Sequence, residues 1–145
     1  MNQQCSIKSR SGVRINYYKS LKEKNTPYLI YLHGLGGNAT IWQEIEKENI
    51  KLGINSIRID LRGHGLSDTP EEKQGYKLEN IAQDIFTIIK KEKIKDFSLI
   101  GHSFGGSMAI VYCTLFKSPS PSALVLIQSS HQYPYKKNRE LNMNP

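Results

Sequence analysis

The sequence has no run of apolar residues long enough to cross a bilayer, which takes about 20 residues. The first six residues, Met1 to Ser6, lack the apolar core of a signal peptide. The chain has 2 cysteines, Cys5 and Cys113, which are too few and too far apart for a disulfide framework or a metal site. We therefore expect a cytoplasmic protein without a membrane partner, in which Cys113 is a small core residue.

Internal repeats and low-complexity tracts are also missing, and no known nucleic-acid motif accompanies the net charge of +7. The lysines are dispersed along the chain, so a solvated basic surface explains the charge better than a nucleic-acid surface does. The 145 residues are enough for one domain with a hydrophobic core. We expect no nucleic-acid partner.

Strands and helices alternate along most of the chain. The residues on either side of Ser11-Gly12 predict a hairpin, and four later apolar runs have the length of buried strands. Three segments with apolar residues at helical spacing separate these runs. This order predicts an α/β fold, a three-layer and mainly parallel sheet with helices on both faces and an N-terminal antiparallel hairpin. The predicted strands are 4–10, 13–19, 28–32, 54–60, 97–100 and 122–128, and the predicted helices are 40–52, 78–93 and 104–117.

The spacing also predicts which side chains face the core. In the first helix, Ile41, Trp42 and Ile45 fall on one side, and Gly53 is placed to end the helix. In the last helix, the same argument selects Met108, Val111, Tyr112 and Leu115.

Glycine-rich segments follow three of the parallel strands, at residues 33–37, 60–68 and 101–106. Ligands of such sheets bind beyond the carboxyl ends of the strands, so these three segments are expected to converge. Residues 60–68 are rich in polar side chains and could form a metal loop or a structural turn, and we favour the turn. No metal site is predicted.

Gly101-x-Ser103-x-Gly105 fits the G-x-S-x-G pattern of a nucleophile elbow, a tight strand-to-helix turn with serine at its apex. The glycines leave room for the neighbouring backbone. The following helix aims its N–H groups and the positive end of its dipole at the reacting oxygen. A strand before the motif and a helix after it supply the required context.

The segment His33-Gly34-Leu35-Gly36-Gly37 could offer a backbone N–H to a substrate oxygen. It could also be a simple connecting turn or a phosphate-binding loop. Neither of the glycine-rich phosphate-binding patterns, G-x-x-x-x-G-K-[ST] or G-x-G-x-x-G, occurs here.

Taken in order, H-G-x-G-G, D-x-R-G-x-G-x-S and G-x-S-x-G-G resemble the α/β-hydrolase superfamily, in particular its esterase-like members, over residues 4–130. The resemblance implies that Ser103 is the nucleophile and that the backbone N–H groups of Leu35 and Phe104 form an oxyanion hole. It also implies that residues 60–68 are a scaffold and that no cofactor is needed. A serine at position 103 argues against the branches that use aspartate there, such as haloalkane dehalogenases and epoxide hydrolases. The glycines of the elbow and loop are Gly34, Gly101, Gly105 and Gly106.

In that family the catalytic acid and histidine follow the nucleophile. Nothing after residue 130 matches them, so we expect a truncated fold. Residues 1–130 would form the N-terminal portion of the hydrolase core, and residues 131–145 a polar tail at the start of a missing lid region. The strand at 122–128 would then lie at the sheet edge. None of the histidines is expected to act as the base: His33, His64, His102 or His131.

The predicted function is hydrolysis of carboxylic esters or similar acyl bonds through an acyl-enzyme at Ser103. The alternative is an inactive, ligand-binding or signalling protein built on a hydrolase scaffold.

Overall fold

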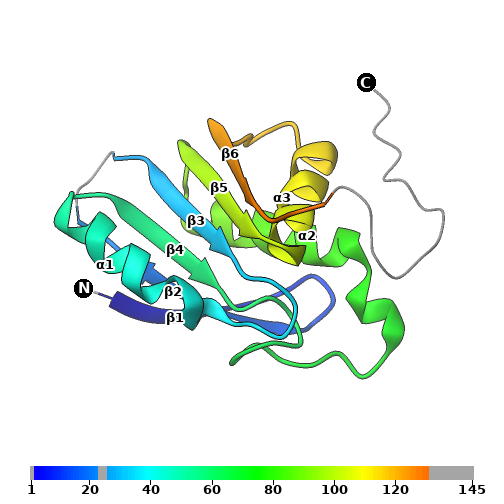
Figure 1. Cartoon of the computed structure of the whole chain (residues 1–145). Coiled ribbons are helices and arrows are strands. Elements are labelled where there is room, and N and C mark those ends of the chain that lie inside the picture. The colour runs from blue at the N-terminus through cyan, green and yellow to red at the C-terminus, as the bar shows by residue number, and fades with distance from the viewer. Residues whose placement is uncertain (1, 23–25, 131–145) are drawn as a thin grey trace.

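A computed structural model describes residues 2–22 and 26–130 of the chain. These residues form a six-stranded sheet with the order β1-β2-β4-β3-β5-β6 (Figure 1). Strands β1 and β2 form an antiparallel hairpin, and β2 is antiparallel to β4. The pairings β4–β3, β3–β5 and β5–β6 are parallel, so the predicted fold class is confirmed. The strands are β1 (Asn2–Lys8), β2 (Arg14–Ser20), β3 (Tyr28–Leu32), β4 (Asn55–Ile59), β5 (Phe97–His102) and β6 (Ala123–Ile127).

Helices lie on both faces of this sheet and complete three layers (Figure 1). Helix α1 (Gln43–Lys51), which follows the short 3-10 helix η1 (Ala39–Trp42), packs on one face. Helices α2 (Leu78–Lys91) and α3 (Phe104–Leu115) pack on the other, and η2 (Lys73–Tyr76) precedes α2. None of the helices in the described ranges combines the length and the apolar character needed to span a membrane.

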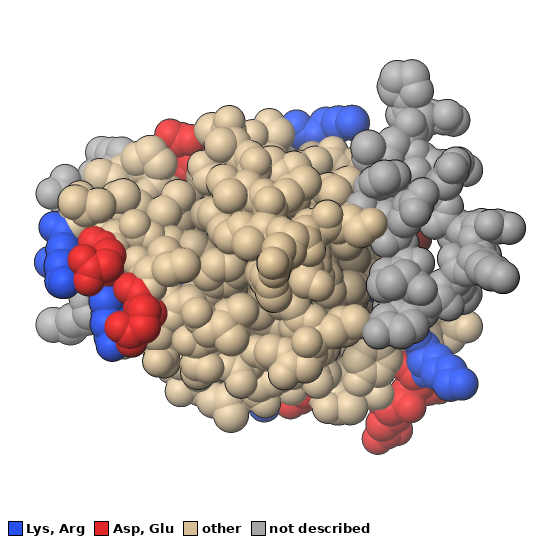
Figure 2. All heavy atoms as spheres, viewed as in Figure 1, with Lys and Arg blue, Asp and Glu red and all other residues tan. Residues whose placement is uncertain are grey.

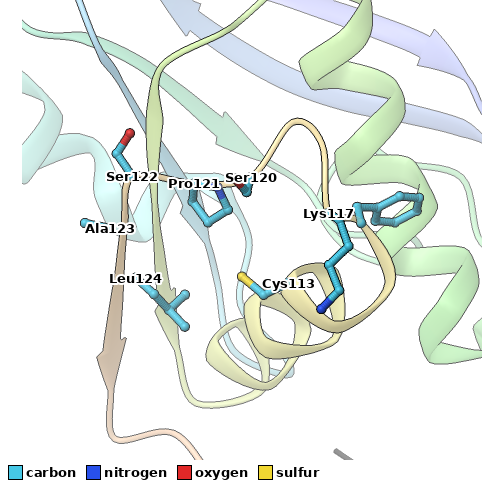
Figure 3. A pocket seen from close by; sticks show the side chains of 8 residues that line it. Cys113, Lys117, Ser120, Pro121, Ser122, Ala123 and Leu124 are labelled. Carbon is cyan, nitrogen blue, oxygen red and sulfur yellow. The ribbon is translucent and has the colours of Figure 1, made fainter. Parts of the chain in front are cut away.

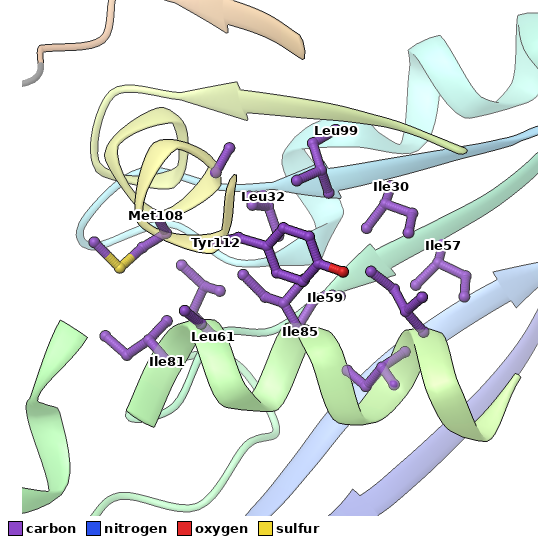
Figure 4. Packing of buried hydrophobic residues seen from close by; sticks show 14 of the residues in the cluster. Ile30, Leu32, Ile57, Ile59, Leu61, Ile81, Ile85, Leu99, Met108 and Tyr112 are labelled. Carbon is purple, nitrogen blue, oxygen red and sulfur yellow. The ribbon is translucent and has the colours of Figure 1, made fainter. Parts of the chain in front are cut away.

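The main core lies between the sheet and the helix pair α2 and α3 (Figure 4). Burial of an aliphatic side chain contributes about 1.5–3 kcal/mol, so this layer supplies most of the driving force for folding. On the opposite face, Tyr31 stacks on Trp42 with ring centroids 5.1 Å apart. Fully buried core side chains include Ile30, Leu32, Ile57, Ile59, Ile85, Leu99 and Tyr112.

The hairpin turn is longer than its Ser11-Gly12 centre suggested. The N–H of Ser9 donates to the Val13 carbonyl at 2.8 Å, and the N–H of Gly12 donates to the Ser9 carbonyl at 3.0 Å. Gly12 has φ +84°, a left-handed conformation that glycine adopts without a steric penalty. The turn therefore takes up residues 9–13, and both strands end earlier or begin later than predicted.

The predicted inner face of the first helix is wrong. Trp42 is buried, but Ile41 and Ile45 are each 48% exposed. The buried residue of α1 is Glu46, whose carboxylate accepts hydrogen bonds from Ser56 Oγ and Arg58 Nε, both at 2.6 Å. A buried charge requires such partners, and this pairing with β4, together with the 3-10 start, sets the rotation of the helix.

Two further predictions about the last helix are only partly correct. Met108, Val111 and Tyr112 are buried, whereas Leu115 is 45% exposed at the end of α3. Cys113 is half-buried rather than a core residue, and desolvation raises the pKa of its thiol. Gly53 follows α1 with φ +77°, as predicted for a residue that ends a helix.

Strand β6 lies at the edge of the sheet and has β5 as its one neighbour among the described residues, as predicted. Its side chains from Leu124 to Ile127 are 38–45% exposed. Figure 2 shows the molecule from the same side as Figure 1. Charged residues lie around the margin of this view, and the middle of the view shows none. Residues 131–145, predicted to begin a lid region, lie outside the described residues.

Candidate active site

The three glycine-rich segments converge at the carboxyl end of the parallel strands, as predicted. A methyl group added to Gly34 would lie 3.3 Å from Ser103 Cβ and 3.1 Å from His102 Nδ1. The backbone N–H of Leu61 donates to His33 Nε2 at 3.0 Å. Residues from the loops after β3, β4 and β5 therefore lie within direct contact of one another.

Ser103 occupies the single residue between β5 and α3, with φ 51° and ψ −117°. This region is sparsely populated by residues other than glycine and costs about 1–3 kcal/mol. The Ser103 carbonyl accepts hydrogen bonds from the N–H groups of Gly106 and Ser107, at 3.0 and 3.2 Å, which begin the helix. The serine side chain is exposed beside the N-terminus of α3.

Packing explains each glycine of the motif. A Cβ on Gly105 would overlap the carbonyl of Leu32, and one on Gly101 would overlap the backbone of Gly106. A Cβ on Gly106 would overlap the side chain of Ser129. The turn can therefore approach β3 and the end of β6 this closely only because these positions carry no side chain.

The loop after β3 places a constrained peptide beside Ser103. The Gly34 carbonyl accepts a hydrogen bond from the backbone N–H of Gly37 at 3.1 Å and contacts His33 Nδ1 at 2.8 Å. Gly34 is buried, whereas Leu35 is 50% exposed. Phe104, the other residue whose N–H was predicted to face substrate, is 9% exposed and begins α3.

The described histidines all have contacts away from the serine hydroxyl. His33 is fully buried, and desolvation by burial lowers the pKa of its imidazole. His64 Nδ1 contacts the Arg62 carbonyl at 3.1 Å, and His102 Nε2 lies 3.4 Å from Gln128 Oε1. In the described ranges, no imidazole contacts Ser103 Oγ. His131 lies outside them.

The turn at residues 60–68 is a scaffold in this structure. Asp60 is 2% exposed, and its Oδ1 accepts from the Ala39 N–H at 2.7 Å. Its Oδ2 accepts from Asn16 Nδ2 at 2.9 Å and from the Leu66 N–H at 3.0 Å. The carboxylate thus joins the loops after β3 and β4 to β2. With its oxygens so occupied and buried, it is poorly placed for proton transfer.

A buried ion pair between Arg62 and Asp84 also stabilises this turn, and sequence reasoning missed it. Arg62 Nε and Nη2 donate to the two oxygens of Asp84 on α2 at 2.8 and 2.7 Å. Asp84 lies between Ile81 and Ile85 on the apolar stripe of α2. A carboxylate on an apolar stripe is the signal that could have predicted a buried cation opposite it.

The described part of the chain contains no group of three or more metal-binding side chains. A cavity of about 470 Å³ opens between the end of α3 and the start of β6 (Figure 3). It is lined by Cys113, Lys117 and Leu124, among others. Because Ile127, at the other end of β6, contacts the Ser103 turn, this cavity is remote from the serine.

Comparison with known proteins gives a family match over most of the chain. Residues 27–143 match the sequence profile of the alpha/beta hydrolase fold. Epoxide hydrolase 3 of Xenopus tropicalis is 31% identical over 123 residues, which cover 78% of this chain and 33% of that protein. Protein ABHD8 of Homo sapiens is 36% identical over 93 residues, which cover 64% of this chain and 20% of that protein.

Solved structures agree with this match. An esterase from Exiguobacterium antarcticum superposes with a TM-score of 0.81 and 26% identity, covering 88% of this chain and 46% of the esterase. The chain thus spans less than half the length of each of these three proteins.

Proposed function

Because the chain belongs to the alpha/beta hydrolase fold family, we propose that its Ser103 site hydrolyses carboxylic esters or similar acyl bonds of small molecules. The observation that carries the proposal is the conformation of Ser103, an exposed serine with φ 51° held between a strand and a helix N-terminus. A strained conformation of this kind persists only where surrounding packing imposes it, and such strain is concentrated at functional sites.

The proposed reaction follows from these positions. The Ser103 Oγ attacks the ester carbonyl carbon, and the carbonyl electron pair moves to the oxygen to give an oxyanion. The backbone N–H groups of Leu35 and Phe104 donate to that oxyanion. Collapse breaks the bond to the alcohol, which leaves with a proton, and water then hydrolyses the acyl-enzyme. Removing one such donor from a serine hydrolase costs roughly 100- to 1000-fold in kcat.

The serine also needs a base. We propose that the base that accepts the hydroxyl proton is none of His33, His64 and His102, because in the described ranges no imidazole contacts Ser103 Oγ. Without a base the hydroxyl is a poor nucleophile. Loss of the whole triad in a serine protease lowers kcat about a million-fold, or by roughly 8 kcal/mol of barrier.

Similarity to epoxide hydrolases raises a second reaction, which the chemistry of Ser103 disfavours. A carboxylate that opens an epoxide forms an ester, and water can hydrolyse that ester. A serine hydroxyl would form an ether, which has no carbonyl for water to attack. The site would be blocked after one turnover, so a serine at this position favours acyl substrates.

A non-catalytic protein on the same scaffold remains the alternative, in which the exposed site binds a ligand without turning it over. Ligand binding that survives Ser103→Ala, with no acylation of the native chain, would favour it. In either case we propose a cytoplasmic protein that acts on a small molecule.

Acylation provides the direct test. The chain is incubated with p-nitrophenyl acetate, with and without imidazole as a diffusible base, and is then analysed by intact-mass and peptide-mapping mass spectrometry. We expect acetylation of Ser103 that imidazole accelerates, that Ser103→Ala abolishes and that Ser107→Ala retains. Acetylation that does not distinguish Ser103 from Ser107 or from surface lysines would reject the proposal.

A further inference from the structure

We propose that His33 is a positioning residue, whose imidazole orients the Gly34–Leu35 peptide so that the Leu35 N–H is available to an oxyanion at Ser103. This inference rests on the proposed function, because the oxyanion is that of the ester reaction. It assigns a role to a buried histidine that the reaction itself does not use.

The contacts of His33 define a single tautomer. The backbone N–H of Leu61 donates to Nε2 at 3.0 Å, so Nε2 carries a lone pair and no hydrogen. The hydrogen of a neutral ring is then on Nδ1, which donates to the Gly34 carbonyl at 2.8 Å. Burial lowers the pKa of His33 and so favours this neutral form. Its titratable neighbours are His64, with ring centroids 5.0 Å apart, and Asp60.

The hydrogen bond to Gly34 fixes the direction of the next N–H. The Gly34 carbonyl oxygen also accepts from the Gly37 N–H at 3.1 Å, so two donors hold one side of this peptide. In a planar trans peptide, the C=O and the following N–H point in opposite directions. The Leu35 N–H therefore points away from both donors. Within the part of the chain that the structure describes, it donates to no protein group.

The same peptide lies against the serine. Gly34 is close enough to Ser103 that an added Cβ would be 3.3 Å from Ser103 Cβ. An oriented N–H without a protein partner, next to an exposed serine, is the arrangement needed for a preorganised oxyanion donor. The turn after β4 takes part as well, since the Leu61 N–H selects the tautomer that can donate to Gly34.

Two substitutions at His33 distinguish the role of Nδ1 from that of Nε2. In His33→Asn, the amide NH₂ can occupy the position of Nδ1 and keep the donor to Gly34. In His33→Gln, the longer side chain can place an acceptor near the position of Nε2 for Leu61, but it lacks the donor at Nδ1. If His33 only filled space, the two substitutions would have equal effects on the Leu35 amide. His64→Gln serves as the control, because His64 contacts Arg62 rather than Gly34.

The experiment uses ¹⁵N NMR of the whole chain. In the native protein we expect the Nδ1–H tautomer of His33, and the Nε2–H tautomer or a charged ring at neutral pH would overturn the proposal. We expect His33→Asn and His64→Gln to keep the Leu35 amide resonance and its hydrogen exchange near those of the native chain. His33→Gln should shift that resonance and speed its exchange. Equal shifts in both His33 variants would also overturn the proposal.

Acylation kinetics add a readout that depends on the proposed function. With imidazole present, His33→Gln should slow acetylation of Ser103 by roughly tenfold to a thousandfold, whereas His33→Asn should remain close to the native rate. The NMR arm needs no reaction at Ser103. Failure of acylation in the native chain would therefore count against the proposed function, while a wrong tautomer would count against the role of His33.

Discussion

The backbone N–H of Ser103 donates a hydrogen bond to the carbonyl of Ile127, 2.9 Å away, and so joins the serine turn to the end of β6. The next residue, Gln128, has φ 47°, and the side chain of Ser129 fills the space left by Gly106. The position of Ser103 thus depends on an edge strand with one neighbour among the described residues. Changes at β6 can reach the site through this contact.

The first prediction concerns this edge. A strand that is apolar, uncharged and exposed invites pairing with other chains. We expect the isolated chain to self-associate or to be poorly soluble. Val125→Lys, at a position that is 45% exposed, should shift it toward monomer, while Leu52→Lys, at one that is 73% exposed, should not. Size-exclusion chromatography with light scattering measures this. A native chain that is a soluble, cooperatively melting monomer would contradict it.

The second prediction concerns unassisted activity. Without added base, the chain should hydrolyse p-nitrophenyl acetate no faster than Ser103→Ala does, because no described imidazole contacts the hydroxyl. The measurement is the initial rate of p-nitrophenolate release for the two proteins. A large rate that depends on Ser103 would show that a substitute base is present, and would redirect attention to His102 or His131.

The third prediction concerns close packing at the serine turn. Gly105→Ala places a methyl group on the Leu32 carbonyl and should lower the free energy of unfolding by about 3 kcal/mol, the upper part of the range for overpacking. At Gly36, which has φ +73° and open space around it, alanine should cost only the left-handed backbone strain of about 1 kcal/mol. Urea unfolding of the two variants compares them. Equal losses would argue against steric exclusion at Gly105.

The fourth prediction concerns the buried ion pair of Arg62 and Asp84, whose side chains are 1% and 3% exposed. Asp84→Asn leaves a buried guanidinium without its counter-charge and should destabilise the fold by about 3–5 kcal/mol. Glu48→Gln breaks the exposed pair with Lys51 and should cost less than about 1 kcal/mol. Chemical denaturation distinguishes them. A small effect at Asp84 would mean that the Arg62 charge is not buried in solution.

The fifth prediction is a pH dependence. Because burial lowers the pKa of His33 in the folded state, the unfolded chain takes up a proton near pH 6.5 that the folded chain does not. The contribution of His33 to the free energy of unfolding is therefore complete above about pH 6.5. Below that pH the contribution decreases, by at most about 1.4 kcal/mol per pH unit. Unfolding measured between pH 5 and 8 should show this slope in the native chain and lose it in His33→Asn. An unchanged slope would assign the effect to another group.

Glu92 also makes a contribution to stability that is lost at acidic pH, but over a separate pH range. Burial favours its neutral form, but hydrogen bonds from Lys19 and Tyr17 outweigh this and hold the pKa of Glu92 below its usual value. The folded state then loses stability from this group only as the pH falls below about 4.3. The window above pH 5 therefore excludes the Glu92 contribution, and comparison with His33→Asn isolates the contribution of His33.

The sequence by itself was sufficient to anticipate the alternation of strands and helices along the chain and the convergence of the three glycine-rich segments. The apolar run at β3 matches its prediction, residue for residue, because a strand buried on both faces is apolar at every position. The buried isoleucines of α2 likewise recur at helical spacing in the sequence. Since parallel strands end at one edge of a sheet, the glycine-rich segments after them could be placed together without coordinates.

Only the tertiary structure decided how polar groups are paired. The burial of Glu46 depends on Arg58, and that of Asp84 depends on Arg62, each a partner from another element. The tautomer of His33 is set by an N–H at Leu61, 28 positions away in the sequence. Apolar burial follows a local periodicity that a sequence displays directly. Hydrogen bonds and ion pairs join residues distant along the chain, so their geometry emerges only once the fold brings the two partners together.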